Sequence, residues 1–175
     1  MKSTTEYYGR AALSLHWSIA TLIAVAIMTG FAADAAGASG QAPLRLHIAA
    51  GGLAGLLTLA RIVWWWRFDT KPRSWSAGAE RRAAAFVHGL LVWVPVLMLA
   101  SGLGMMAAAG GPSQIFDGPL PNFEEFGPRR PHGFGARLLL VLASVHVAAA
   151  LFHHFVRKDR LIARMWPAAR EIRED

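Results

Sequence analysis

The chain of 175 residues contains no cysteine, and this absence excludes several kinds of site at once. Disulfides, iron–sulfur clusters and zinc sites with thiolate ligands all require cysteine side chains. The C-x-x-C-H motif that attaches haem covalently is excluded for the same reason. Any haem in this protein must therefore be held by axial ligands and packing alone.

Charged residues are also scarce, at 17% of the chain, against about 25% in soluble proteins. Hydrophobic residues reach 54% and gather in four long stretches, at about 11–33, 43–66, 83–109 and 132–156. Each stretch has the roughly 20 residues needed to cross a hydrocarbon core. Because backbone groups in lipid must be satisfied within their own segment, each should be a helix. The sequence predicts an all-α protein, an integral membrane four-helix bundle formed by a single domain of residues 1–175.

The first stretch has some features of a secretory signal, since Lys2 and Arg10 precede it and small residues end it. It is longer than the roughly 7–15 apolar residues of a signal core, so we interpret it as a retained helix. Residues 110–131 are rich in glycine and proline and are expected to form a folded external loop.

Lysine and arginine are distributed unevenly between the two sides of the predicted bundle. The N-terminus, the connection at 61–82 and the C-terminal tail carry fourteen of the eighteen. Cytoplasmic segments of membrane proteins are enriched in these residues, so both termini should be cytoplasmic in a multi-pass protein of the bacterial inner membrane. This placement accounts for most of the net charge of +7 without a nucleic-acid partner.

The chemistry of the sequence lies in its histidines, which all fall within or at the ends of the apolar stretches. They are His16, His47, His88, His132, His146, His153 and His154. Ionisable groups inside a membrane are costly and usually functional. A zinc carrier would normally add carboxylates within the helices, and here Asp34 lies only at a helix end.

Spacing arranges four of these histidines into two levels. His132 and His146 are fourteen residues apart, which places them on one helix face to within about 40° and separates them by about 21 Å. Matching by depth pairs His146 with His16 on the cytoplasmic side and His132 with His47 on the other. Two imidazoles are the usual axial set of a low-spin, electron-carrying haem. The spacing therefore predicts two haem b groups, one in each leaflet.

The other three histidines lie outside these two pairs. His153 lies beyond the inner level, beside Lys158 and Asp159, where it would protonate a quinone or simply anchor the helix end. His88 lies at the depth of the inner haem. It would either replace His16 as a ligand or form a hydrogen bond to a haem propionate. His154 is expected at the interface. Gly51 and Gly55 follow His47 by one and two turns, which fits either a flat cofactor or a helix-packing motif.

Several segments resemble the bacterial cytochrome b561 family. They are the Leu15-His16-Trp17 core of 10–17, the segment 43–47 followed by Gly51, the stretch from His132 through His146 to Asp159, and the tail 161–167. The resemblance implies a di-haem, four-helix membrane cytochrome with axial ligands at His16, His47, His132 and His146. The segment from His153 to Pro167 is similar to that of superoxide oxidases, which implies oxidation of superoxide and reduction of ubiquinone. Pro131 departs from the family, which often has an aromatic residue there.

The first functional hypothesis is thus an enzyme that takes electrons from superoxide at the periplasmic face and passes them to ubiquinone. Four arginines near the outer haem would steer this anion or pair with haem propionates: Arg45, Arg129, Arg130 and Arg137. Asp117, Glu124 and Glu125 would oppose the steering.

The alternative is an electron-transfer subunit that relays electrons between the quinone pool and a periplasmic redox protein. It predicts a docking surface on residues 110–131, with three exposed aromatic side chains: Phe116, Phe123 and Phe126.

Overall fold

The computed structural model describes residues 8–68, 78–116 and 118–159, together with 162 and 165. Within these residues the regular structure is entirely helical. The four long helices are α1 (Arg10–Ala36), α2 (Gln41–Arg67), α3 (Gly78–Ala108) and α4 (Arg129–Phe152). All four are long and apolar enough to cross a membrane. The chain is therefore all-helical with four candidate spans, as the composition predicted.

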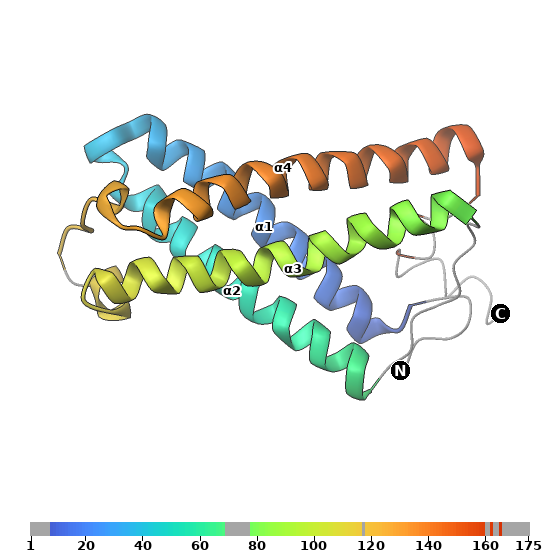
Figure 1. Cartoon of the computed structure of the whole chain (residues 1–175), viewed down its shortest axis with the longest axis horizontal. Coiled ribbons are helices and arrows are strands. Elements are labelled where there is room, and N and C mark those ends of the chain that lie inside the picture. The colour runs from blue at the N-terminus through green and yellow to red at the C-terminus, as the bar shows by residue number, and fades with distance from the viewer. Residues whose placement is uncertain (1–7, 69–77, 117, 160–161, 163–164, 166–175) are drawn as a thin grey trace.

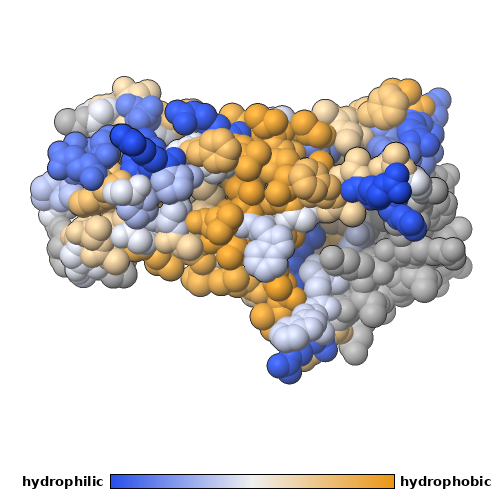
Figure 2. Space-filling view, in the orientation of Figure 1, coloured by the Kyte–Doolittle hydropathy of each residue, from blue (hydrophilic) through white to orange (hydrophobic). Residues whose placement is uncertain are grey.

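The helices run up and down through one bundle, so that their ends gather at two levels (Figure 1). The turn between α1 and α2 lies at the same end as the loop between α3 and α4. The start of α1, the end of α2, the start of α3 and the end of α4 lie at the other. A hydrophobic band crosses the middle of the surface and polar residues collect at both ends (Figure 2). This is the surface expected of a protein surrounded by lipid tails.

The connection between α1 and α2 is tight because glycine occupies two demanding positions. Gly37 has a φ of +53°, in the region that favours glycine. Gly40 brings its backbone so close to α1 that a Cβ there would lie 2.5 Å from the Ala33 carbonyl oxygen. This turn makes α1 and α2 antiparallel neighbours and brings their inward faces into contact.

Small residues line the contact between α1 and α2, which is the most extensive in the bundle. Ala12 and Ala26 of α1 are buried, as are Ala50 and Ala54 of α2. Without a hydrophobic driving force between helices in lipid, close backbone approach of this kind supplies the packing. The other pair, α3 and α4, packs through larger side chains around Val94, Leu139 and Leu142.

The helix boundaries differ from the predicted stretches by a few residues. Helix α3 begins at Gly78, before the charged residues Arg81 and Arg82, and α4 begins at Arg129 with Pro131 in its first turn. Helix α4 ends at Phe152, and a short π-helical turn, η4 (His153–Arg157), completes the fourth stretch. Two single-turn 3₁₀ helices, η2 (Pro112–Ile115) and η3 (Phe123–Glu125), order the loop between α3 and α4.

Candidate functional site: two layers of histidine

Two histidine rings face each other near the end of the bundle where α2 and α4 begin; we call this the outer layer. His47 projects from α2 and His132 from α4, and their ring centres are 5.9 Å apart. These are the two residues that the depth argument paired. Because α3 separates α2 from α4 in the sequence, the two rings come together only through the fold.

The hydrogen bonds of the outer layer fix the proton of each ring on Nδ1. His47 donates from Nδ1 to the Ala26 carbonyl oxygen at 2.7 Å, and a carbonyl can only accept. His132 Nδ1 lies 2.9 Å from Ser101 Oγ, whose own hydroxyl donates to the Met98 carbonyl at 3.0 Å. Ser101 therefore accepts from His132. Both rings are left with a lone pair on Nε2, the atom that would bind a metal.

His132 Nε2 is the observation that tests whether a cofactor fits here. It is buried and has no hydrogen-bond partner among the described residues, although unsatisfied buried polar atoms are uncommon. An imidazole nitrogen binds a first-row metal at about 2 Å, so a metal between two imidazoles separates the ring centres by about 6 Å. The 5.9 Å separation of His47 and His132 fits that requirement. The outer layer is thus suited to hold haem iron between two rings.

Glycines on the other two helices leave space around the outer layer. A Cβ at Gly30 of α1 would lie 2.9 Å from His47 Nδ1, so no side chain can replace that glycine without moving the ring. Gly102 of α3 lies beside His132, where a Cβ would be 3.7 Å from Cε1. The small residues on α1 and α3 thus complement the histidines on α2 and α4.

A second group of polar side chains, the inner layer, lies one leaflet away. The rings of His16 and His146 are 6.4 Å apart, and those of His88 and His146 are 5.2 Å apart. Two bonds to a shared metal need about 6 Å between ring centres, so the distances favour His16 over His88 as the partner of His146. His88 remains close enough to act on the same site from α3.

Arg61 completes the inner layer, although from the sequence alone it is only one of the cations that indicate the cytoplasmic side. It projects from α2, is partly buried, and its Nη1 lies 3.2 Å from His16 Nδ1. A spacing signal could have found it. Each helix places one residue in each layer fourteen positions apart: His16 and Gly30, His47 and Arg61, Gly102 and His88, His132 and His146. Fourteen residues return to nearly the same helix face, about 21 Å along the axis.

A comparison with known protein families identifies the family of this chain. The family model for prokaryotic cytochrome b561 matches residues 7–168 of the chain. The chain belongs to the prokaryotic cytochrome b561 family. It is also 30% identical over 165 residues to a curated protein named cytochrome b562 from Cereibacter sphaeroides, covering 90% of this chain and 94% of that protein.

Family membership defines the general activity of the protein. It is a multi-pass membrane cytochrome that binds haem b and transfers electrons. Haem iron accepts and releases single electrons, which is the chemistry that the cofactor supplies when bound. The chain's own residues must hold it, set its surroundings and connect it to reactants at the two ends of the bundle.

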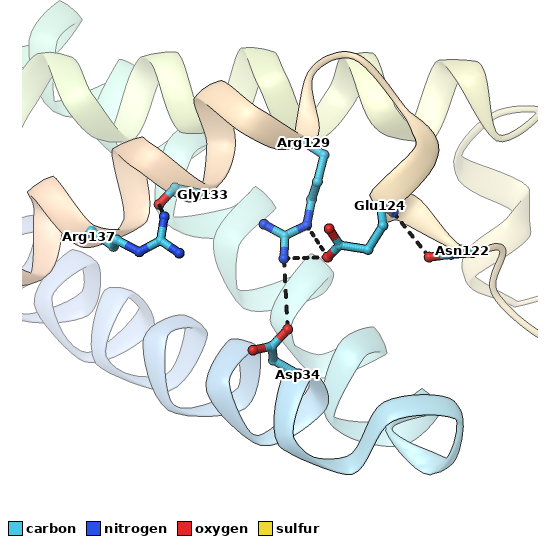
Figure 3. Close-up of polar contacts among 6 residues, drawn as sticks. All are labelled: Asp34, Asn122, Glu124, Arg129, Gly133 and Arg137. Atoms are coloured by element: carbon cyan, nitrogen blue, oxygen red, sulfur yellow. Dashed lines mark hydrogen bonds and ion pairs between the residues drawn. The ribbon is translucent and has the colours of Figure 1, made fainter.

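At the outer end of this cytochrome, the four candidate arginines have different surroundings. Arg129 lies between two carboxylates, at 2.6 Å from Glu124 and 3.9 Å from Asp34 (Figure 3). Arg45 donates a short hydrogen bond to the Gly118 carbonyl oxygen. Arg129 is thus largely neutralised, whereas the other three arginines have no carboxylate partner among the described residues.

The outward-facing positions of Arg130 and Arg137 leave them open to solvent or headgroups. Both side chains are exposed. Arg137 donates a hydrogen bond within its own helix, with Nη1 3.5 Å from the Gly133 carbonyl oxygen (Figure 3). Asp117, which the sequence argument set against the arginines, lies outside the described residues.

At the opposite end, His153 joins α4 to the start of α3. Its Nδ1 forms a short hydrogen bond with Asp159, and its Nε2 lies 3.4 Å from Glu80 of α3. Glu80 also accepts from Arg157 Nη1 at 2.8 Å. The sequence predicts a role for His153 and Asp159 but gives no signal for Glu80, which is distant in sequence and lies in the charged start of α3.

The two other residues named at this end are more peripheral. Lys158 is exposed and adopts a left-handed conformation with a φ of +56°, which ends the π-helical turn. His154 is exposed and packs edge-on against Phe155, with ring centres 4.7 Å apart. The position of His154 at the membrane interface stays a prediction.

Proposed function

We propose that this cytochrome carries electrons across the bacterial inner membrane from superoxide at the periplasmic face to ubiquinone at the cytoplasmic face. In this proposal His47 and His132 hold one haem b, and His16 and His146 hold a second. The observation that carries it is the pair of imidazole layers, with ring separations of 5.9 and 6.4 Å, at the two ends of one bundle. A single layer would bind a cofactor but would not connect the two faces.

The orientation follows from the cations. Fourteen of the eighteen lysines and arginines belong to the N-terminus, the 61–82 connection and the C-terminal tail, which supports a cytoplasmic position for both termini. The outer layer, near the starts of α2 and α4, then faces the periplasm. The Trp64 and Trp65 side chains near the end of α2 are partly buried and suit the cytoplasmic interface.

Superoxide suits the outer end because its oxidation needs no open iron position. Each superoxide loses one electron and leaves as dioxygen, so two are needed for each quinone that takes up two electrons and two protons. An iron with two imidazole ligands has no free position for oxygen. Arg45, Arg130 and Arg137 provide positive charge near this end, while Arg129 is occupied by Glu124. Opposite charge near an entry point speeds the encounter with a small anion.

The cytoplasmic end supplies proton-transfer groups for quinone reduction. His153 is flanked by Asp159 on one nitrogen and Glu80 on the other. A histidine between two carboxylates can pass a proton from water to a nearby acceptor. In the proposal, His153 faces the quinone and Glu80 and Asp159 replenish its proton. The exposed Lys158 is a further proton donor at the surface.

The direct test is a pulse of superoxide added to the purified, oxidised cytochrome. The optical spectrum should show haem reduction within the mixing time, and superoxide dismutase should abolish it. Added ubiquinone should then reoxidise the haems, with two superoxides consumed for each quinol formed. If the haems stay oxidised, or reduce only as slowly as with unspecific reductants, superoxide is not the donor.

A second function is favoured by one observation in the loop between α3 and α4. Phe116 exposes 85% of its surface there, whereas Phe123 and Phe126 pack against each other with ring centres 5.7 Å apart. An exposed aromatic side chain at the outer end is suited to docking. In this alternative the cytochrome relays electrons between the quinone pool and a periplasmic redox protein. Co-purification of such a protein, lost on Phe116→Ser, would support it over the superoxide proposal.

A further inference from the structure

Arg61 is a charged side chain within the last two turns of the membrane-spanning helix α2. It lies six residues before Arg67, the last residue of α2, and therefore about 9 Å from the helix end. Its side chain is partly buried, and Nε is buried without a hydrogen-bond partner among the described residues. Charged residues inside a membrane are normally paired with another group or with a ligand.

No carboxylate of the described residues pairs with Arg61. The carboxylates of the described residues lie at helix ends or in the outer loop. They are Asp34, Glu80, Glu124, Glu125 and Asp159. The ion pairs formed by Glu80 and Asp159 go to His153 and Arg157 of η4. Tyr8 is close enough to interact electrostatically, but a phenol group supplies no strong countercharge. The guanidinium of Arg61 thus has a positive charge that the described protein does not balance.

The contact that Arg61 does make is with the ring that is proposed to bind the inner haem. Arg61 donates from Nη1 to His16 Nδ1, because arginine has no acceptor. A histidine that binds a metal through Nε2 normally carries its proton on Nδ1 and donates it to a second group. The outer layer already has this arrangement, at His47 and His132. In the inner layer, the same arrangement requires Arg61 to release His16.

We propose that Arg61 is a binding residue for a carboxylate, and that this carboxylate is a propionate of the inner haem. The proposal rests on the inner haem put forward above. Arg61 stands fourteen residues after His47 on the same face of α2, as His146 stands after His132 on α4. Released from His16, its planar fork would form two parallel hydrogen bonds to a carboxylate, the geometry that arginine favours. The haem brings the countercharge that the chain lacks.

The test compares Arg61→Gln and Arg61→Lys with Arg67→Gln in the purified holoprotein. Arg67 lies on the same helix and is exposed, with its guanidinium carbon 5.3 Å from the centre of the Trp66 ring. Haem content, the rate of haem transfer to an apoglobin scavenger and the midpoint potentials of both haems are measured. Arg61→Gln should speed loss of one haem at least tenfold. It should also lower that haem's potential, since a nearby positive charge favours the reduced iron.

The two companion variants separate charge from geometry. Arg61→Lys keeps the charge but not the fork, so it should preserve most of the potential while still losing haem faster than the wild type. Arg67→Gln should leave both quantities unchanged. Equal effects of the Arg61 and Arg67 variants would overturn the proposal, since they would reflect helix charge in general.

A modified cofactor identifies the group that Arg61 binds. The full-length apoprotein is reconstituted with haem b or with its dimethyl ester, which lacks the propionate charges. The difference between wild type and Arg61→Lys should disappear with the ester. A difference that persists would show that Arg61 acts on the ring of His16 or on another anion, and would overturn the proposal. Slower quinone reduction with unchanged haem retention would also overturn it, by assigning Arg61 to the quinone.

The proposal and the function on which it depends fail differently. A wild-type protein with one haem per chain and no signal from the inner layer would refute the two-haem path itself. Two haems that Arg61→Gln retains equally well would leave that path standing and would refute only the role of Arg61.

Discussion

The outer histidines hold their protons on Nδ1 because oxygen acceptors are placed opposite those atoms. Ala26 supplies a carbonyl to His47, and Ser101 supplies a hydroxyl to His132. Such partners orient a ligand ring and increase its basicity. Ser101 is a side chain, so its contribution can be removed without disturbing the backbone.

Replacing Ser101 with alanine should weaken the outer haem site. Without the hydroxyl, His132 Nδ1–H loses its acceptor and the ring no longer has a fixed orientation. Loss of a partner of this kind typically costs about 10–100-fold in metal affinity. We expect faster loss of one haem to an apoglobin scavenger and a change in the spectrum of that haem alone.

Ser144→Ala is the matched control for this prediction. Ser144 is an exposed serine of α4 whose hydroxyl donates to the Leu140 carbonyl of its own helix, and it contacts no histidine among the described hydrogen bonds. It should retain both haems. Similar haem loss in the two variants would show that the Ser101 hydroxyl has no particular role at His132.

Residue type and spacing were sufficient to predict which histidines lie close together in pairs, since imidazole is rare and costly in lipid. Their role as haem ligands stays a prediction. Residue type and spacing were not sufficient to find Arg61 or Ser101. An arginine near a helix end satisfies the charge rule for topology, which hid its place in the inner layer. Ser101 acts across α3 and α4, and such a contact depends on helix rotation, which spacing within one helix does not give.

At the scale of helices, glycine is where two backbones come closest. A Cβ at Gly55 of α2 would lie 2.6 Å from the Cβ of Leu99 on α3. By contrast, a Cβ at Gly51 would make only an ordinary 3.9 Å contact with Ala26. The sequence left two readings of this glycine pair. The structure assigns Gly55 to helix packing against α3.

Gly55→Ala should therefore destabilise the bundle, because the new methyl group meets a Cβ that cannot rotate away. Overpacking of this kind costs about 1–3 kcal/mol, more than the roughly 0.5–1 kcal/mol that alanine gains over glycine within a helix. We expect a lower midpoint temperature for loss of the haem spectrum on heating in detergent.

Gly52→Ala provides the comparison, since nothing lies within 4 Å of a Cβ at that position. It should leave the midpoint unchanged or raise it slightly. A Gly55→Ala protein as stable as the wild type would mean that α2 and α3 are farther apart than this packing requires.

Helix existence was predictable, and helix ends were less so. Four apolar stretches require four helices in lipid, but helices continue past the apolar residues where nothing stops them. Glu80 and Arg81 are included in α3 because charged residues are good helix formers in water or headgroups. Pro131 does not delay α4, since proline is tolerated in a first turn.

For the molecule as a whole, the orientation in the membrane decides which histidine layer lies nearer the periplasm and which lies nearer the cytoplasm. The apolar band and polar ends indicate a bilayer (Figure 2), but they are compatible with either direction. Only the asymmetry of fourteen cations against four distinguishes the faces. The outer loop could not be predicted in the same way, because the Arg129, Glu124 and Asp34 contacts join three segments without any periodic signal.

Because the chain has no cysteine, single introduced thiols can report its orientation without background. Ser113 in η2 and Ala79 at the start of α3 are exposed at opposite ends of the bundle. In intact cells with a permeable outer membrane, a membrane-impermeant maleimide should label Ser113→Cys but not Ala79→Cys. Both should react once the inner membrane is opened.

Val141 provides the control, since it exposes 58% of its surface in the middle of α4. A Val141→Cys thiol should react in neither state, because thiolates do not form in lipid. The reverse pattern, with Ala79→Cys labelled in intact cells, would invert the molecule, place His16 and His146 toward the periplasm, and reverse the proposed direction of electron flow.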